Sequence, residues 1–400
     1  MSQVRTNSDA PAREARVHLQ TYARQPITLI RGQGCWVTDD AGHDYLDLVA
    51  GIAVDVLGHA HPAVAEAIAR QAATLVQVSN LYYTVPQLEL AEALVARSAF
   101  DRVFFTNSGT EANEAALKLA RRHGGERGAH EVVSLTGSFH GRTFGSLAAT
   151  GQPKYQAPFA PLPPGFRHVA PNDVTALDEA VTDATCAVLL EPIMGEGGVH
   201  PLTDAFLTAA RAACDRVGAL LILDEVQSGI GRTGTFFAFE SSTIVPDAVT
   251  LAKGLAGGIP IGALLVREEA AAFRPGDHGT TLGGNPVSCA AALATLRVLD
   301  EEHLMANARD RGRQLFERLG RLVSDGTLAE VRGRGLMVGL ETSKPIARAA
   351  MAAARDRHGL LINATGDTTI RLVPPLTISA GEIDLAVERI GAALADAASA

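Results

Sequence analysis

The chain has 400 residues, of which 47% are hydrophobic and 20% charged, and its formal net charge is −9. This length and composition predict a globular protein whose core is large enough for more than one domain. The acidic balance argues against nucleic acid as the main partner, because phosphate-backbone binding calls for a clustered basic excess.

The cysteines and the apolar runs bear on where the protein works. Its four cysteines, Cys35, Cys186, Cys214 and Cys289, have no metal-ligand spacing, so we expect no metal site and a reducing, cytoplasmic setting. Residues 1–26 carry arginines but no signal-peptide core. No apolar run reaches membrane-spanning length. We therefore expect neither secretion nor membrane insertion.

The predicted elements begin with a polar, mobile lead-in over residues 1–11 and a short helical segment that extends to Arg24. Turn residues at 39–42 between two short strand-like runs predict a hairpin over residues 34–48. From His61 onward helices alternate with short apolar strands. Helices are predicted over 62–75, 86–96, 111–122, 205–216 and 286–300, and strands over 102–106, 131–135, 185–190, 219–224, 248–252 and 263–266.

Apolar strands that alternate with helices predict an α/β fold with a mostly parallel sheet covered on both faces. Ligands of such sheets collect at the carboxyl ends of the strands. Further along, helices are predicted over 303–324, 346–358 and 379–398, and strands over 328–332, 336–341 and 369–372. We therefore expect a large domain over residues 61–290 and a smaller α+β domain over residues 291–400, with residues 1–60 packing against the smaller one.

Two predicted strands end in side chains that suit pyridoxal phosphate. One apolar run ends at Asp224 and the next ends at Lys253. An acid keeps the pyridine nitrogen of this cofactor protonated, and a lysine forms a Schiff base with its aldehyde. Among the four lysines only Lys253 leaves an apolar strand for a glycine-rich loop. Either feature alone is more typical of an exposed strand end, and only their combination with a phosphate site favours catalysis.

A candidate phosphate site follows the first strand of the large domain. The segment Ser108-Gly109-Thr110 precedes a predicted helix, whose N-terminal N–H groups form an anion site together with the hydroxyls. Gly109 lets the backbone approach a phosphate closely. Ser108 and Glu111 also have the spacing of a capping box, which needs no ligand, so both interpretations stay open here. A second hydroxyl-and-glycine loop at 278–286 is equally consistent with a plain turn.

Several segments carry a family resemblance: GIAVDVLGH (51–59), NSGTEAN (107–113), SFHGRT (138–143), EPIMGEGG (191–198), DEVQ (224–227), AKG (252–254) and TTLGGNP (280–286). Together they resemble the class III aminotransferases of fold type I, and most closely the acetylornithine aminotransferases of arginine biosynthesis. The resemblance extends from about residue 27 to residue 394. It implies transamination of N-acetylornithine with 2-oxoglutarate, which gives N-acetylglutamate 5-semialdehyde and glutamate, by a pyridoxal-phosphate-dependent homodimer with shared sites.

The resemblance also implies a role for each matching residue. Lys253 would be the Schiff-base residue and proton shuttle, Asp224 would pair with the ring nitrogen, and Arg142 would clamp a substrate carboxylate. Arg371 would bind the α-carboxylate of glutamate, and Glu196 would mask it when an ω-amine is bound. The implied cofactor-binding residues are Ser108, Gly109, Thr110, Phe139, Asp224, Glu225, Val226, Gln227, Lys253 and, for the neighbouring subunit's cofactor, Thr281; the implied substrate-binding residues are Arg142, Thr280, Glu196 and Arg371.

Two departures from the family pattern concern the substrate. Leu282 stands where relatives usually have an aromatic residue, and Asp55 where many have asparagine. Ornithine, succinylornithine, 4-aminobutyrate and lysine-pathway aminotransferases therefore remain alternatives. Aminomutase relatives would differ in needing no 2-oxoglutarate. An alternative of another class is a catalytically silent protein that only binds pyridoxal phosphate.

Overall fold

The computed structural model describes residues 10–399. The predicted lead-in therefore lies outside the described residues over 1–9. The first helix, α1 (Ala10–Val17), ends at Val17 instead of extending to Arg24. None of its residues is buried, and a helix this short needs tertiary packing to extend.

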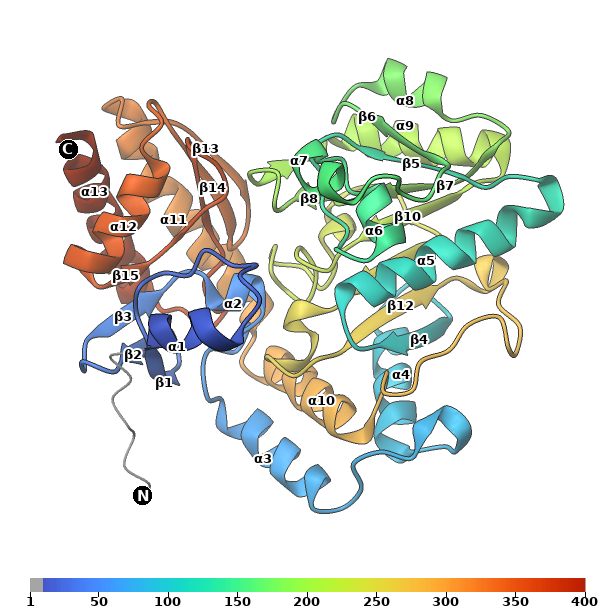
Figure 1. The fold of residues 1–400 in the computed structure, drawn as a ribbon, viewed down its shortest axis with the longest axis horizontal. Helices are drawn as coiled ribbons and strands as arrows, with labels where there is room; N and C mark the ends of the chain where they lie inside the picture. Colours follow the sequence, from blue (N-terminus) through green and yellow to red (C-terminus); the bar gives the residue numbers. More distant parts are fainter. Residues whose placement is uncertain (1–9, 400) are drawn as a thin grey trace.

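The large region is built on a seven-stranded sheet with the order β4-β12-β11-β10-β7-β5-β6 (Figure 1). Only β12 runs antiparallel to its two neighbours, so the prediction of a mostly parallel α/β sheet is confirmed. The strands are β4 (Arg102–Thr106), β5 (Glu131–Leu135), β6 (Phe166–Val169), β7 (Thr185–Leu190), β10 (Leu220–Asp224), β11 (Ala248–Leu251) and β12 (Gly262–Val266).

Helices cover both faces of this sheet. Ile222 of β10 packs with residues of α5 (Gly109–Gly124), whereas its neighbour Leu223 packs with residues of α9 (Asp204–Val217). Successive side chains of a strand point to opposite faces, so these helices lie on opposite sides. Neither β6 nor α8 (Val174–Ala180) was predicted from the sequence. In the edge strand β6 only Val169 is buried, so β6 does not read as an apolar run.

The second region joins both ends of the chain. In one sheet β1 (Leu29–Gln33), β2 (Trp36–Asp39) and β3 (Asp44–Asp47) are followed by β15 (Leu360–Leu361), which pairs parallel with β3. The predicted hairpin is present as β2 and β3. Figure 1 shows these blue strands beside the red C-terminal helices. The helices are α11 (Leu304–Ser324), α12 (Ala347–His358) and α13 (Ala380–Ser399).

A second four-stranded sheet of this region has the order β13-β14-β17-β16. Its strands are β13 (Leu328–Arg334), β14 (Met337–Thr342), β16 (Asn363–Ala364) and β17 (Thr369–Leu372). The pairing of β3 with β15 supports our proposal that residues 1–60 belong with the smaller domain of residues 291–400. We also propose that residues 61–290 form the large domain. Limited proteolysis that released a stable 61–290 fragment would support these boundaries.

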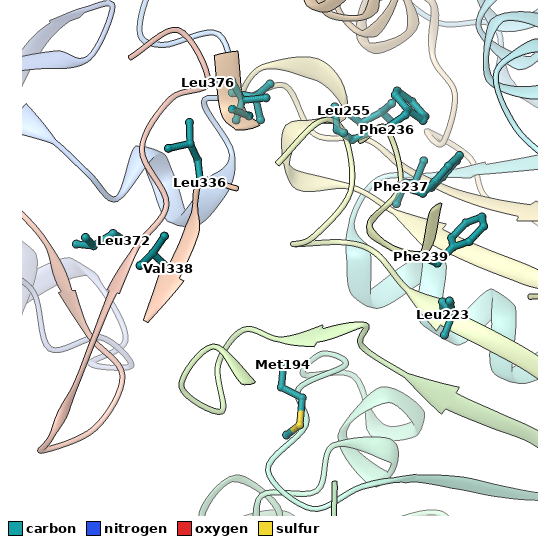
Figure 2. Packing of buried hydrophobic residues seen from close by; sticks show 14 of the residues in the cluster. Met194, Leu223, Phe236, Phe237, Phe239, Leu255, Leu336, Val338, Leu372 and Leu376 are labelled. Carbon is teal, nitrogen blue, oxygen red and sulfur yellow. The ribbon is translucent and has the colours of Figure 1, made fainter. Parts of the chain in front are cut away.

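One large hydrophobic cluster extends through both regions. It includes Leu336 and Leu376 from the C-terminal region and Phe236 and Leu255 from the large one (Figure 2). Helix α10 (Pro286–Glu301) connects the regions and packs on α3 (Pro62–Ala72) and α4 (Val85–Ala96). Among residues 10–399, no helix combines the length and the apolar character needed to cross a bilayer.

Candidate active site

A cavity of about 380 Å³ opens at the carboxyl ends of the central strands. This volume suits a small cofactor with a substrate. The lining comes from the turn between β4 and α5, from the segment after β5, and from the ends of β10 and β11. Of the predicted site residues, the lining includes Ser108, Gly109, Thr110, Phe139, Arg142, Asp224, Val226, Gln227 and Lys253.

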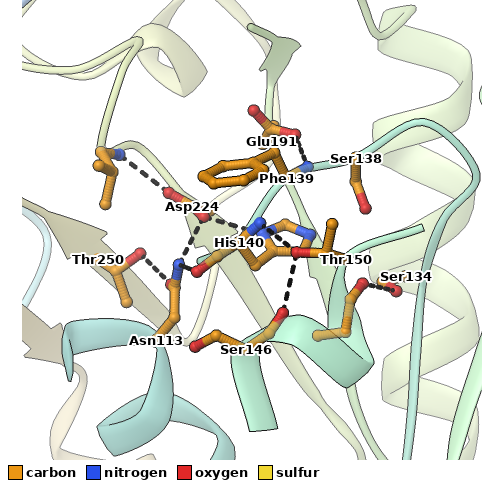
Figure 3. Close-up of polar contacts among 12 residues, drawn as sticks. Asn113, Ser134, Ser138, Phe139, His140, Ser146, Thr150, Glu191, Asp224 and Thr250 are labelled. Carbon is orange, nitrogen blue, oxygen red and sulfur yellow. Dashed lines mark hydrogen bonds and ion pairs between the residues drawn. The ribbon is translucent and has the colours of Figure 1, made fainter. Parts of the chain in front are cut away.

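A buried hydrogen-bond network fixes the carboxylate of Asp224 (Figure 3). Its Oδ2 accepts a bond from Asn113 Nδ2 at 2.7 Å and lies 2.8 Å from His140 Nδ1, and its Oδ1 accepts from the N–H of Val226 at 3.0 Å. Asn113 in turn accepts from Thr250 Oγ1 at 2.8 Å. Such outer contacts hold a functional carboxylate in one orientation. Sequence reasoning gave Asn113 and His140 no role, although both lie in the quoted segments.

Lys253 reaches the same cavity from the adjacent strand. Asp224 on β10 is paired in register with Thr250 on β11, and Lys253 follows three residues later with a positive φ of 34°. Burial lowers the pKa of Lys253; the charge of Arg371 lowers it further, while Glu196 and Asp224 act in the opposite direction. A lowered pKa increases the share of the neutral, nucleophilic amine at any given pH.

The N-terminus of α5 faces the cavity. Ser108 is the N-cap of this helix, because its Oγ accepts from the N–H of Glu111 at 3.3 Å. The capping role, which the sequence left open beside phosphate binding, is therefore present. Ser108, Gly109 and Thr110 also line the cavity. A Cβ on Gly109 would come within 2.7 Å of Val226 Cγ1. Glycine here therefore brings the start of the helix close to the opposite wall, where free N–H groups attract an anion.

Phe139 and Glu191 form the wall beside Asp224. The N–H of Phe139 donates to Glu191 Oε2 at 2.9 Å, and the N–H of Gly195 donates to Glu191 Oε1 at 3.1 Å. Burial raises the pKa of Glu191 to about 7, although His140 and the two backbone donors oppose that shift. Glu191 thus fixes both the segment that carries Phe139 and the loop that follows β8 (Ile193–Met194).

Arg142 lies exposed at the mouth of the cavity. Its guanidinium carbon is 3.9 Å from the ring centroid of Tyr155 and 5.5 Å from that of Phe139. Stacking on aromatic rings holds a guanidinium group in place without a counter-charge. The fork therefore remains available for a carboxylate. Tyr155 was not predicted from the sequence, because it lies in the short helix α7 (Pro153–Gln156), outside the recognised motifs.

Arg371 is fully buried on β17 and forms an ion pair with Glu196. Its NH1 also donates to Gln227 Oε1 at 3.1 Å, and its NH2 donates to Asn363 Oδ1 at 2.8 Å. Burial alone would raise the pKa of Glu196, but Arg371 and Lys253 bring it below its ordinary value. Neither Arg371 nor Glu196 lines the cavity itself, and Gln227 connects the pair to it.

Three further expected residues, besides Glu196 and Arg371, are not part of the lining. The carboxylate of Glu225 accepts from the N–H groups of Ala238 and Phe239, both at 2.9 Å, and these contacts support a structural role. Thr280 Oγ1 is 3.3 Å from Asn107 Nδ2, at the edge of the site. Thr281 is exposed, and within a single chain it is not part of the lining.

The fold and the site define an α/β protein with a carboxylate and a lysine at the ends of adjacent strands of one cavity. The sequence matches the family described as "Aminotransferase class-III" over residues 19–394. The chain belongs to the class III aminotransferase family.

Within this family, the chain is highly similar to several acetylornithine aminotransferases. The chain is 53% identical to the acetylornithine aminotransferase of Gloeobacter violaceus, with 92% of this chain and 93% of the relative covered. It is 51% identical to that of Mycolicibacterium smegmatis, with coverages of 96% and 97%. The solved N-acetylornithine aminotransferase of Stenotrophomonas maltophilia is similar with a TM-score of 0.82 and 39% identity, covering 94% of this chain and 97% of that one. The ornithine aminotransferase of Toxoplasma gondii, solved with pyridoxal phosphate at partial occupancy, gives a TM-score of 0.94 at 32% identity, with coverages of 99% and 96%.

Proposed function

We propose that this protein transfers the δ-amino group of N-acetylornithine to 2-oxoglutarate with pyridoxal phosphate as cofactor, a step of arginine biosynthesis. The observation that carries the proposal is the placement of Asp224 and Lys253 in one cavity at the ends of adjacent strands. The names and high identities of the bacterial relatives support the choice of substrate.

The residues of the cavity fit the cofactor. The start of α5 suits its phosphate, Phe139 provides a ring face, and Asp224 offers a buried carboxylate to the ring nitrogen. Gln227 and Val226 complete the wall. When bound, pyridoxal phosphate supplies an aldehyde for the substrate amine and a ring that withdraws electrons from the bond to be broken.

The protein's own residues then orient the substrate and move protons. Arg142 binds a substrate carboxylate at the mouth, which leaves the far amino group pointing toward Lys253. The neutral amine of Lys253 would take the proton from the amine-bearing carbon of the substrate and deliver it to the cofactor carbon that carried the aldehyde. Arg371 is paired with Glu196 while the amine substrate occupies the site, and it binds the second carboxylate of glutamate or 2-oxoglutarate when Glu196 moves away.

The amine specificity is tested by mixing the cofactor-loaded protein with single amines in the absence of an acceptor. We expect the visible absorbance of the bound cofactor to disappear rapidly with N-acetylornithine and glutamate, and much more slowly with ornithine, because the acetyl group removes the charge of the α-amine. Stopped-flow absorbance at equal amine concentrations gives the rates.

Other outcomes of this experiment select the alternatives. A preference for ornithine, succinylornithine, 4-aminobutyrate or a lysine-pathway amine would contradict the substrate assignment but retain the chemistry. Turnover that needs no 2-oxoglutarate would favour an aminomutase. Absorbance that no amine changes would indicate a protein that only binds the cofactor.

We also propose a homodimer with shared active sites. Leu81, Tyr82 and Tyr83 are 81%, 69% and 90% exposed, which is unusual for a run of large apolar residues. Nearby side chains tie this segment to the loop of Thr281, since Asn80 Nδ2 donates to the carbonyl of Thr280 at 2.9 Å. If a second copy covers this segment, Thr281 of the first copy would lie at the cavity of the second copy.

The dimer is tested by Tyr83→Glu, which would place a charge in the proposed interface. We expect sedimentation velocity to show a dimer for the unchanged protein and a monomer for the variant, with loss of bound cofactor in the variant. Val245→Glu is a matched control, because Val245 is also exposed but lies far along the chain from this segment. A variant that remained dimeric with full cofactor occupancy would contradict the shared site.

We place the protein in the cytoplasm. Its four cysteines are all buried and unpaired with one another, as suits a reducing compartment. Cell fractionation that recovered the protein with an exported marker would contradict this placement.

A further inference from the structure

The loop that carries Glu196 rests on the C-terminal sheet between two arginines. Gly339 of β14 is paired with Arg332 of β13 on one side and with Arg371 of β17 on the other. Residues directly opposite on neighbouring strands share a face of the sheet. The two arginines therefore flank a glycine on one face, two strands apart, which is about 10 Å.

The backbone of the loop fills the space above this glycine. A Cβ on Gly339 would lie 2.9 Å from Val199 Cβ and 3.0 Å from the carbonyl oxygen of Gly198. That oxygen accepts two bonds from Arg332, from Nε at 3.0 Å and from NH2 at 2.8 Å. Arg332 is only 8% exposed, so both bonds are shielded from water. Arg332 thus holds the loop at Gly198 while Arg371 pairs with Glu196.

The other end of the loop is held as well. The N–H of Gly195 donates to the buried carboxylate of Glu191 at 3.1 Å. Gly198 has a φ of 108°, a conformation that favours glycine. Glu196 therefore lies between two fixed points, and its carboxylate can leave Arg371 only through rotations of residues 195–197. The hydrogen bonds from Arg332 to the carbonyl of Gly198, which anchor the loop, confine these rotations to residues before Gly198.

A second connection ties the anchor to the strand of Arg371. Arg332 NH2 forms an ion pair with Glu341 Oε2 at 2.8 Å, and Thr369 Oγ1 donates to the same oxygen at 2.8 Å. Thr369 is two residues before Arg371 on β17, so both side chains point to one face. The strand that carries Arg371 and the loop that carries Glu196 are thereby held in a fixed relation.

We propose that Arg332 is a positioning residue for substrate selection: by holding Gly198, it presents Glu196 to Arg371 and sets how readily Arg371 binds a dicarboxylate. This inference rests on the proposed function, in which Glu196 competes with a substrate carboxylate for Arg371. A carboxylate that is already held in place loses less conformational freedom on pairing. A loosened loop therefore weakens the Glu196–Arg371 pair and favours the competing dicarboxylate.

The test compares Arg332→Gln, Arg332→Lys, Glu196→Gln and the double variant in the cofactor-loaded protein. Calorimetry measures the Kd of glutarate, a dicarboxylate without an amino or keto group, and steady-state kinetics give KM for 2-oxoglutarate and kcat/KM for N-acetylornithine. For Arg332→Gln we expect glutarate to bind about 5-fold more tightly, the lower end of ordinary coupling between sites. KM for 2-oxoglutarate falls with it, while kcat/KM for N-acetylornithine also falls.

The other variants separate positioning from general damage. The ratio of glutarate affinity to kcat/KM for N-acetylornithine measures the selectivity, and Glu196→Gln raises this ratio further. Adding Arg332→Gln to Glu196→Gln has no additional effect, because Arg332 acts through Glu196. Arg332→Lys keeps the charge and a single donor nitrogen, and we expect it to retain part of the selectivity. Arg334→Gln is the matched control: Arg334 lies on the same strand but donates to the carbonyl of Ala238, and we expect it to leave the ratio unchanged.

Four results would overturn the inference, and the last of them would also contradict part of the proposed function. Equal losses with both substrates for Arg332→Gln, or a shift that persists in the Glu196→Gln background, would make Arg332 merely structural. If Arg334→Gln changed the selectivity ratio as much as Arg332→Gln does, Arg332 would again be merely structural. If Glu196→Gln itself left glutarate binding and both substrates unaffected, the assigned role of Glu196 would fail as well.

Discussion

Replacement of Lys253 by alanine should abolish turnover, with a loss of about 10⁴-fold or more in kcat, the upper range for removal of a positioned acid–base group. Lys253 lines the cavity with a lowered pKa, and no other lysine lies there: Lys118, Lys154 and Lys344 are exposed. The variant should still bind pyridoxal phosphate, because the start of α5 and Asp224 are untouched. Coupled assay of glutamate formation gives kcat, and absorbance gives cofactor occupancy.

Lys344→Ala is the matched control for this change. Lys344 lies on the surface before α12, and its backbone carbonyl accepts from Thr342 Oγ1 and from the N–H of Ile346. We expect its kcat to match that of the unchanged protein. A Lys253→Ala protein that still transaminated at a substantial rate would remove the central residue of the mechanism.

The second large effect is expected for Asp224→Asn, with kcat lower by about 10³-fold, the cost of losing one preorganised electrostatic group. Asparagine fills the same space and accepts from Asn113 or Val226, but it carries no negative charge to keep a proton on the ring nitrogen. Steady-state kinetics at saturating cofactor separate this loss from weaker cofactor binding. Fluorescence titration gives the cofactor Kd.

Asp247→Asn provides the comparison. Asp247 precedes β11 at the opposite end of the sheet, where it accepts from Arg211 and from the N–H of Leu221, both at 2.7 Å. Its loss should lower the melting temperature while kcat stays within a few-fold. Similar kcat losses in both variants would mean that Asp224 acts through stability rather than through charge.

The sequence predicted best those parts that depend on local pattern. The apolar strand that ends at Asp224 and the strand before Lys253 were found because buried parallel strands are apolar throughout. The edge strand β6 and the short β15 lacked that pattern, since their pairing depends on neighbours far along the chain. The local pattern also predicted too long a first helix, because α1 ends at Val17 rather than at Arg24.

The same distinction holds within the candidate site. Motif resemblance directed attention to the residues that face the cavity, such as Phe139 and Arg142. It did not show that Tyr155 supports Arg142, or that Arg332 holds the loop of Glu196. These contacts join segments far apart in the sequence, and only the folded chain brings them together. The resemblance implied that Glu225 binds the cofactor, whereas its carboxylate accepts hydrogen bonds from the backbone N–H groups of residues 238 and 239.

The parallel pairing of β3 with β15 affects the order in which the parts of the protein can fold during synthesis. During synthesis β3 leaves the ribosome more than three hundred residues before its partner, so the N-terminal hairpin waits with an unpaired edge while the large sheet forms. The polar side chains of Asp44 and Asp47 on that edge strand disfavour pairing with other chains in the meantime. The smaller region can close only after nearly the whole polypeptide has been translated.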